Sequence, residues 1–184
     1  KDDQLIFEEK SEAFTVGISL SSDEKYFFIT SSDHNTSEQY YFDVSEKEPN
    51  PKLIKKRKKG ILYSVNSWDG KFYNHTNEDA EDFKIDITEN LKNQNWKVFI
   101  PAKEEVLIGG LTFLNNWIIR SETSDALDKL FVINIATKKE EELIFSNENV
   151  YVPGISLIQR DKNTDEIYLG YSSPKTQSRV YSYN

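Results

Sequence analysis

A serine nucleophile is the first chemistry to test in this sequence, because two short motifs place a serine close to a glycine. These motifs are Gly17-Ile18-Ser19 and Gly154-Ile155-Ser156. Both lack the second glycine of the Gly-x-Ser-x-Gly turn, and both fall in stretches predicted to be strands. The two histidines, His34 and His75, lie in polar segments without a supporting motif. We therefore expect no catalytic triad within this chain.

Metal and cofactor sites have little support from the residue types. The chain has no cysteine, and its two histidines are 41 residues apart, so no zinc-ligand spacing is present. Asp79, Glu81 and Asp82 could suggest calcium, but the central glycine and terminal glutamate of an EF-hand are missing, which favours a solvated acidic turn. No phosphate-binding glycine motif occurs. We expect no catalytic residue, cofactor or metal site here.

Two further groups of residues could bind a ligand. The segment Lys52–Lys59, KLIKKRKK, holds six of the 23 basic residues and could bind phosphate or an acidic partner. A solvated connection between two repeats explains it more simply. Trp68, Trp96 and Trp117 lie in or beside predicted strands. Packing in a core explains these tryptophans better than a platform for stacking bases.

The elements that would position these residues form a repeat. A short polar turn followed at once by an apolar strand occurs four times, at Asp23, Asp69, Asn115 and Asp165, in steps of 46, 46 and 50 residues. Such turns tolerate the tight conformations that hairpins need. Repeats of this length with several short strands are typical of β-propeller blades. Unrelated hairpins of a β-sandwich are the alternative, which the even spacing disfavours.

The fold class that follows is all-β: a partial β-propeller of about four four-stranded antiparallel blades, the last one strand short. The repeats run approximately over 11–56, 60–101, 105–146 and 150–184 within a single domain, 1–184. Gln4–Glu8 is expected to be an additional strand, and Phe14–Leu20 to be a strand with one apolar face. The other expected strands are 26–29, 39–44, 52–55, 62–66, 72–75, 83–87, 96–100, 107–114, 117–120, 129–135, 142–145, 155–159, 167–171 and 179–183.

Composition excludes several classes of protein. Hydrophobic and aromatic contents of 37% and 13% suit a folded chain, and the net charge of −8 disfavours partners such as nucleic acid or an anionic membrane. No apolar run approaches the ~20 residues of a membrane span. The absence of cysteine fits a cytoplasmic location, which we expect, and a periplasmic one equally. The absence of methionine indicates a segment of a longer chain.

Several runs of residues resemble one known family. They are Leu5–Glu38, Tyr63–Val65 followed by Asp69–Tyr73, Asn77–Ala80 followed by Phe83, and the final YSSPKTQSRVYSYN. In this order they resemble the propeller domain of the oligopeptidase B (protease II) group of the prolyl oligopeptidase family. The resemblance covers nearly the whole chain and implies its last four blades or so.

The resemblance implies a function that lies mostly outside this chain. The family has a seven-bladed propeller over an α/β-hydrolase domain with a Ser-Asp-His triad, and the oligopeptidase B group cleaves short peptides after basic residues. The implied partners are thus the chain's own C-terminal hydrolase domain and short peptide substrates. The hydrolase domain is absent here, so no catalytic residue carries over. The alternative is a free-standing propeller that binds a protein partner.

Self-association of the chain is a further expectation. An incomplete ring would expose strand edges, which natural sheets avoid. We expect a two-fold dimer in which Gln4–Glu8 of one copy adds beside Arg179–Tyr183 of the other.

Overall fold

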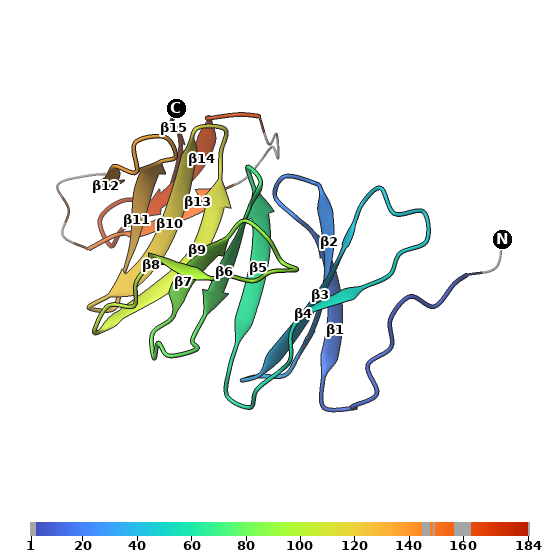
Figure 1. The fold of residues 1–184 in the computed structure, drawn as a ribbon. Coiled ribbons are helices and arrows are strands. Elements are labelled where there is room, and N and C mark those ends of the chain that lie inside the picture. The colour runs from blue at the N-terminus through green and yellow to red at the C-terminus, as the bar shows by residue number, and fades with distance from the viewer. Residues whose placement is uncertain (1–2, 145–147, 149, 157–162, 184) are drawn as a thin grey trace. The chain divides into compact units, whose positions relative to one another are not determined.

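The computed structural model describes residues 3–144, 148, 150–156 and 163–183. In these residues the regular structure consists of fifteen β-strands in four antiparallel sheets (Figure 1). Three sheets have four strands and the last has three, and neighbours in each sheet are consecutive in sequence. This arrangement confirms the predicted all-β class and the four repeats. The chain forms two compact units, Lys1–Ala102 and Lys103–Asn184, which we call the first and the second unit.

The first unit holds two four-stranded sheets. Its second strands begin at Tyr26 and Lys71, close to the predicted starts, because each follows a tight polar turn. Asp69 and Gly70 in the second of these turns both have positive φ, as a two-residue hairpin requires. The strands are β1 (Thr15–Leu20), β2 (Tyr26–Ser32), β3 (Ser37–Asp43), β4 (Lys52–Lys55), β5 (Tyr63–Trp68), β6 (Lys71–Thr76), β7 (Lys84–Thr88) and β8 (Lys97–Ile100).

The second unit holds one sheet of four strands and one of three. Its strands are β9 (Val106–Phe113), β10 (Trp117–Ser124), β11 (Leu127–Asn134), β12 (Glu140–Glu142), β13 (Val152–Ser156), β14 (Ile167–Ser172) and β15 (Arg179–Tyr183). β10 is longer than predicted because Asp125 and Ala126, both with positive φ, close a tight hairpin that extends the ladder. The predicted strand 142–145 lies earlier, at Glu140–Glu142. Residues 145 and 157–159 of the predictions lie outside the described residues.

The stretch Gln4–Glu8, expected to be a strand, has no ladder partner among the described residues of this single chain. Side chains of the first sheet contact this N-terminal segment instead. The Phe7 ring lies 4.8 Å from the Tyr40 ring, between centroids, and Ser31 Oγ donates a hydrogen bond of 2.6 Å to Glu9. The N-terminal segment therefore docks on the first sheet through the side chains of Phe7 and Glu9.

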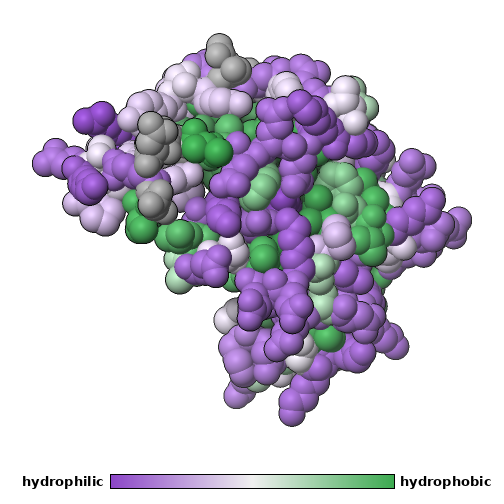
Figure 2. All heavy atoms as spheres, turned by 90° about the vertical axis from the view of Figure 1, so that its left-hand side faces the viewer, coloured by the Kyte–Doolittle hydropathy of each residue, from purple (hydrophilic) through white to green (hydrophobic). Residues whose placement is uncertain are grey.

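The apolar face predicted for the first strand is present but exposed. Val16, Ile18 and Leu20 retain 50%, 64% and 46% of their accessible surface. Figure 2 shows that hydrophobic side chains also reach the surface elsewhere, gathered in a few groups among mostly hydrophilic ones. No helix in the described part of the chain is long and apolar enough to cross a membrane.

Each unit has its own hydrophobic core between its two sheets. The predicted packing of the tryptophans is confirmed: Trp68 is buried, Trp96 packs against the first core and Trp117 against the second. Burial of each large apolar side chain contributes ~1.5–3 kcal/mol. The first core consists of Phe28, Tyr41, Ile54, Tyr63, Val65, Phe72 and Leu91, and the second of Leu114, Ile119, Leu130, Val132, Ile167 and Leu169.

Candidate functional site

The repeated turns join neighbouring sheets within each unit. In the first unit the Asp23 carboxylate accepts hydrogen bonds from Ser21 Oγ at 2.7 Å and from Ser67 Oγ at 2.9 Å. Ser22 N donates to Asn66 Oδ1 at 2.9 Å in the same place. Asp23 is buried, so its role is wider than that of a turn residue. It fastens the β1–β2 turn to the end of β5.

The second unit has an equivalent junction with different residues. Asn116 donates from its backbone N to Asp165 Oδ1 at 2.7 Å and from Nδ2 to Asp165 Oδ2 at 2.6 Å. Asn115 N donates to Thr164 O at 2.9 Å. Two of the repeat residues found by spacing, Asn115 and Asp165, are therefore brought together. This junction is exposed, unlike the one around Asp23.

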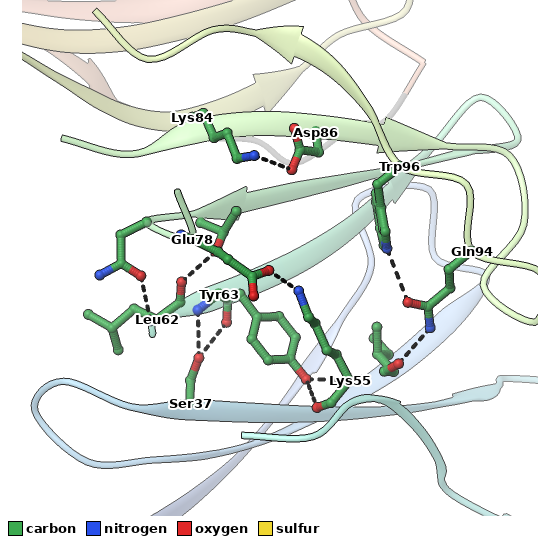
Figure 3. A network of polar contacts seen from close by, with 12 residues as sticks. Ser37, Lys55, Leu62, Tyr63, Glu78, Lys84, Asp86, Gln94 and Trp96 are labelled. Atoms are coloured by element: carbon green, nitrogen blue, oxygen red, sulfur yellow. Dashed lines mark hydrogen bonds and ion pairs between the residues drawn. The ribbon is translucent and has the colours of Figure 1, made fainter. Parts of the chain in front are cut away.

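A buried tyrosine from the second sheet enters a β-bulge of the first. The register of β3 and β4 shifts between Gln39 and Tyr40. At this bulge the Tyr63 hydroxyl accepts a hydrogen bond from Gln39 N at 2.8 Å. It also accepts one from Lys55 N at 3.2 Å and donates to Lys55 O at 2.5 Å (Figure 3). Burial raises the pKa of Tyr63 to about 12, so the hydroxyl keeps its proton.

Side chains of β3 satisfy the edge of β5 that lies away from β6. Ser37 Oγ donates to Tyr63 O at 2.8 Å and accepts from Tyr63 N at 2.7 Å, and Gln39 Oε1 accepts from Val65 N at 2.7 Å. Buried backbone groups need such partners, since leaving one unsatisfied costs ~1–3 kcal/mol. Two polar residues of one sheet thus fix the position of the neighbouring strand.

The network in Figure 3 continues to the outer strands of the first unit. Lys55 of β4 forms an ion pair with Glu78, and Gln94 Nε2 donates to Ile54 O at 2.5 Å. Lys84 Nζ lies 3.3 Å from Asp86 on β7. The contacts of Lys55 and Gln94 connect β4 of the first sheet to the segments before β7 and β8 of the second sheet, whereas the Lys84–Asp86 pair lies within β7.

The basic segment Lys52–Lys59 is divided by the structure into paired and exposed residues. Lys52 pairs with Glu46 at 2.7 Å, Lys55 with Glu78, and Arg57 with two glutamates. The remaining lysines, Lys56, Lys58 and Lys59, are exposed, and no ion pair is found for them in the described residues. Strand β4 takes the first four residues, and the rest form the predicted connection.

Arg57 organises a cluster that the sequence analysis missed. It donates to Glu9 at 2.5 Å and to Glu38 at 3.1 Å, and its guanidinium carbon lies 4.2 Å from the centre of the Phe14 ring. Hydrogen bonds from Ser31, from the Ser11 backbone and from Arg57 lower the pKa of Glu9 to about 2. The cluster fastens the N-terminal segment to the first sheet.

A second cluster of buried charges lies in the β9–β12 sheet. Arg120 has no exposed surface; it donates to Glu122, and to Glu140 Oε1 at 2.7 Å, and lies 4.3 Å from the centre of the Phe131 ring. Lys103 Nζ is 3.1 Å from Glu122. Burial alone would raise the pKa of Glu122, but hydrogen bonds from Arg120 and Lys103 outweigh it and lower that pKa. The sequence signal for this cluster was a pair of charged residues, Arg120 and Glu122, two positions apart in an apolar strand.

The residues singled out for catalysis and metal binding are not assembled into a site. Ser19 is exposed on β1 opposite Phe28, His34 is exposed in the β2–β3 loop, and His75 stacks on Phe83 at 4.6 Å between centroids. The side chain of Ser156 is outside the described residues. Asp79 and Glu81 are exposed, and Asp82 is half-buried beside them. Within the described ranges no three acidic or histidine side chains lie close enough to hold a metal ion.

Comparison with known proteins identifies a family that matches this chain. All of residues 1–184 match the family model described as prolyl oligopeptidase, N-terminal beta-propeller domain. Protease 2 of Moraxella lacunata is 26% identical over the whole chain, and the chain covers 26% of that protein. Dipeptidyl aminopeptidase BI of Pseudoxanthomonas mexicana is 24% identical over 99% of the chain, and the chain covers 25% of that protein. The chain thus spans about a quarter of the length of these relatives.

A solved structure shows the same fold. Oligopeptidase B from Trypanosoma brucei, in a closed form with covalently bound antipain, superposes with a TM-score of 0.86 at 24% identity; the match covers 95% of this chain and 26% of that one. In homologues the propeller packs with a C-terminal α/β-hydrolase domain of the same polypeptide. The chain belongs to the N-terminal β-propeller domain of the prolyl oligopeptidase family.

Proposed function

We propose that this chain is a substrate-gating part of the propeller of a serine endopeptidase that cleaves short peptides after basic residues. The observation that supports the proposal is the match of all 184 residues to the family's propeller domain. The preference for basic residues rests on the likeness to Protease 2, which is 26% identical. The chain is not catalytic by itself; the nucleophile is supplied by a hydrolase domain outside these residues.

Selectivity in such an enzyme follows from access. A ring of rigid β-sheets over an active site admits short unfolded peptides and excludes folded domains. The polar junctions described above suit this role, because each fixes one sheet against the next. The contribution of this chain is therefore the shape of the passage, and the chemistry occurs elsewhere in the protein.

A free-standing propeller that binds a protein partner is the second candidate. The propeller fold hosts many functions, so the fold itself does not decide between them. The coding sequence downstream of Asn184 discriminates the two. A Gly-x-Ser-x-Gly motif followed by Asp and then His supports the peptidase, and a stop codon directly after Asn184 supports the interaction module.

Hydrolysis by the full-length protein tests the proposal. Fluorogenic peptides with arginine, lysine or proline before the cleaved bond are offered to the full-length protein and to the 184-residue chain. We expect cleavage after arginine and lysine by the full-length protein and none by the chain. Cleavage only after proline would contradict the specificity, and no cleavage by the full-length protein would contradict the peptidase.

We also propose a cytoplasmic location for the protein and self-association for the isolated chain. The lack of cysteine suits the cytoplasm, and fractionation of cells that produce the protein tests this against the periplasm. Self-association of the isolated chain remains a prediction, and so does the strand exchange in which Gln4–Glu8 of one copy adds beside Arg179–Tyr183 of the other. Light scattering after size exclusion at micromolar concentration measures it, and a monodisperse monomer would contradict it.

A further inference from the structure

A carboxylate site on the first sheet is filled by the chain's own N-terminal segment. Ser31 of β2 and Glu38 of β3 lie opposite each other in the ladder and are both buried. Arg57, in the connection after β4, donates from its backbone N to Glu38 Oε2 at 2.9 Å. Glu9 Oε2 accepts hydrogen bonds from Ser31 Oγ at 2.6 Å and from Arg57 Nη2 at 2.5 Å. Two donors that are distant in sequence thus hold one carboxylate oxygen.

An aromatic contact lies beside this carboxylate site. Phe7 contacts Tyr40, two positions after Glu38 on β3, with 4.8 Å between the ring centroids. Aromatic pairs at this separation attract each other. Phe7 and Glu9 are partly buried, whereas Glu8 between them is exposed. The site therefore matches a segment in which an aromatic residue is followed two positions later by a glutamate.

The groups that form the site hold one another in place independently of the segment that fills it. Arg57 Nη2 donates to Glu38 Oε1 at 3.1 Å, and the guanidinium carbon lies 4.2 Å from the centre of the Phe14 ring. The Tyr40 hydroxyl also donates to Glu38 Oε1, at 2.8 Å. If Glu9 leaves, the buried Glu38 carboxylate keeps these partners, and the Ser31 hydroxyl can bind water. Departure of the segment therefore carries no penalty of an unpaired Glu38.

The N-terminal segment is attached to the first sheet through few side chains. No residue from Asp3 to Lys10 has a ladder partner in the described part of the chain. Leu5 and Ile6, ahead of the two anchors, retain 75% and 44% of their accessible surface, and Lys10 after them is exposed. A segment with so few buried contacts opens more readily than strands that share a ladder. The segment should therefore open while the first sheet stays folded.

We propose that residues 3–10 are a reversible strap over a peptide-binding site on the first sheet. The site recognises an acidic segment in which an aromatic residue precedes a glutamate by two positions, and the strap fills it in cis. Because the strap is tethered, it competes at a high effective concentration with any separate peptide. The strap keeps the site closed to such peptides until it is released. All of these contacts lie within the first unit, and binding at the site needs no peptidase activity.

Cleavage by trypsin after Lys10 measures opening of the strap. In the docked state the next residue, Ser11, donates from its backbone N to Glu9 Oε1 at 2.9 Å, so the bond to be cleaved is held. When closing is fast, the rate of cleavage follows the open fraction. Cleavage after Lys47 in the β3–β4 loop is the internal reference, because this lysine is exposed and lies outside the strap.

Two variants of the 184-residue chain weaken the attachment without changing the strap. Ser31→Ala and Arg57→Met each remove one donor to Glu9. Both should raise the rate of cleavage after Lys10 about tenfold and leave the reference rate unchanged. Ser32→Ala, next to Ser31 on β2, and Lys58→Met, next to Arg57, are the matched controls and should change neither rate.

Either of two results of this experiment would overturn the strap. The first is cleavage after Lys10 that is as slow in Ser31→Ala and Arg57→Met as in the wild type. The second is wild-type cleavage after Lys10 that occurs only as fast as the whole chain unfolds, since the strap would then have no opening of its own. Should Arg57→Met fail to fold, Ser31→Ala decides the question alone.

A labelled peptide tests the site itself. A fluorescent peptide of residues 3–13 is added to the wild-type chain and to the double variant Phe7→Ala/Glu9→Gln, whose strap is disabled. Fluorescence anisotropy should show binding to the double variant at least tenfold tighter than to the wild type, because the strap no longer competes. Peptide carrying Glu9→Gln should bind the double variant at least tenfold more weakly, whereas the matched control peptide with Glu8→Gln should bind like the parent. No binding to the double variant, or equal binding to both chains, would overturn the site.

Discussion

The two units hold their sheets together with different kinds of residue. In the first unit an aromatic core is combined with buried polar contacts, in which Tyr63, Ser37 and Gln39 connect one sheet to the backbone of the next. In the second unit an aliphatic core joins the sheets, and the junction at Asn116 is exposed. Buried polar contacts specify one register, because a shifted strand would leave them unsatisfied. The first unit should therefore be the more sensitive to single polar substitutions between its sheets.

The largest effect is expected from the buried charges of the second unit, which lie within the β9–β12 sheet and not between two sheets. Arg120→Met removes the partner of Glu122 and Glu140, and leaves a carboxylate that is 5% exposed without its main partner. Loss of one member of a buried pair costs ~3–5 kcal/mol. Urea unfolding measures the loss, and Lys139→Met, whose ion pair with Glu141 is exposed, is the control. A loss below that of the control would contradict the structural role of Arg120.

The next effect tests the buried tyrosine. Tyr63→Phe should lower the free energy of unfolding by ~1–3 kcal/mol, because Gln39 N and the Lys55 backbone lose the hydroxyl. Tyr41→Phe is a matched control from the same core, since no hydrogen bond of its hydroxyl is identified in the described residues. Equal losses in the two variants, measured by urea unfolding, would show that the bulge does not depend on Tyr63.

Smaller effects on stability are expected at the two turn junctions, at Asp23 and at Asp165, and they compare the two units directly. Asp23→Ala should cost ~1–2 kcal/mol, since Ser21 and Ser67 lose a buried acceptor. Asp165→Ala should cost less than ~1 kcal/mol, because water can replace the exposed bonds to Asn116. The same denaturation measurement applies to both. A larger loss of unfolding free energy for Asp165→Ala than for Asp23→Ala would show that the second unit depends more on its turn junction than the first.

The smallest expected effect is on the pH dependence of stability. The pKa of Glu9 is lowered from 4.5 to about 2, so its ionised form stabilises the fold above about pH 4.5, and this contribution is lost as the pH falls toward 2. Glu9→Gln should therefore be less stable than the wild type at pH 7, with the difference shrinking as the pH falls below 4.5. Thermal unfolding between pH 3 and 7 follows it. A difference that is constant with pH would show that charge at Glu9 does not matter.

Much of the fold could be predicted because it depends on local patterns. Turns such as Asp69-Gly70 and the apolar strands after them lie next to each other in sequence, and their spacing revealed all four sheets. The tryptophans were placed correctly for the same reason. Gln4–Glu8 was expected to be a strand, but a short apolar run also suits a segment that docks on a sheet without pairing in its own chain, as Phe7 and Glu9 do here.

The contacts between distant segments of the chain could not be predicted from the sequence. Arg57 and Glu9 are 48 residues apart, and Asp23 and Ser67 are 44 apart. Such pairs depend on how sheets and connecting segments pack together, which no local period encodes. The basic segment Lys52–Lys59 shows the same limit: its composition was evident, but which lysines are paired depended on partners as distant as Glu78.

The most direct test of the account is to locate the reactive serine of the full-length protein. A serine-directed fluorophosphonate is added to the full-length protein and to the 184-residue chain, and the labelled residue is identified by peptide mass spectrometry. The account predicts one labelled serine in the full-length protein, outside residues 1–184, and none in the chain. Stoichiometric labelling of a serine within residues 1–184, or no labelling of the full-length protein, would contradict it.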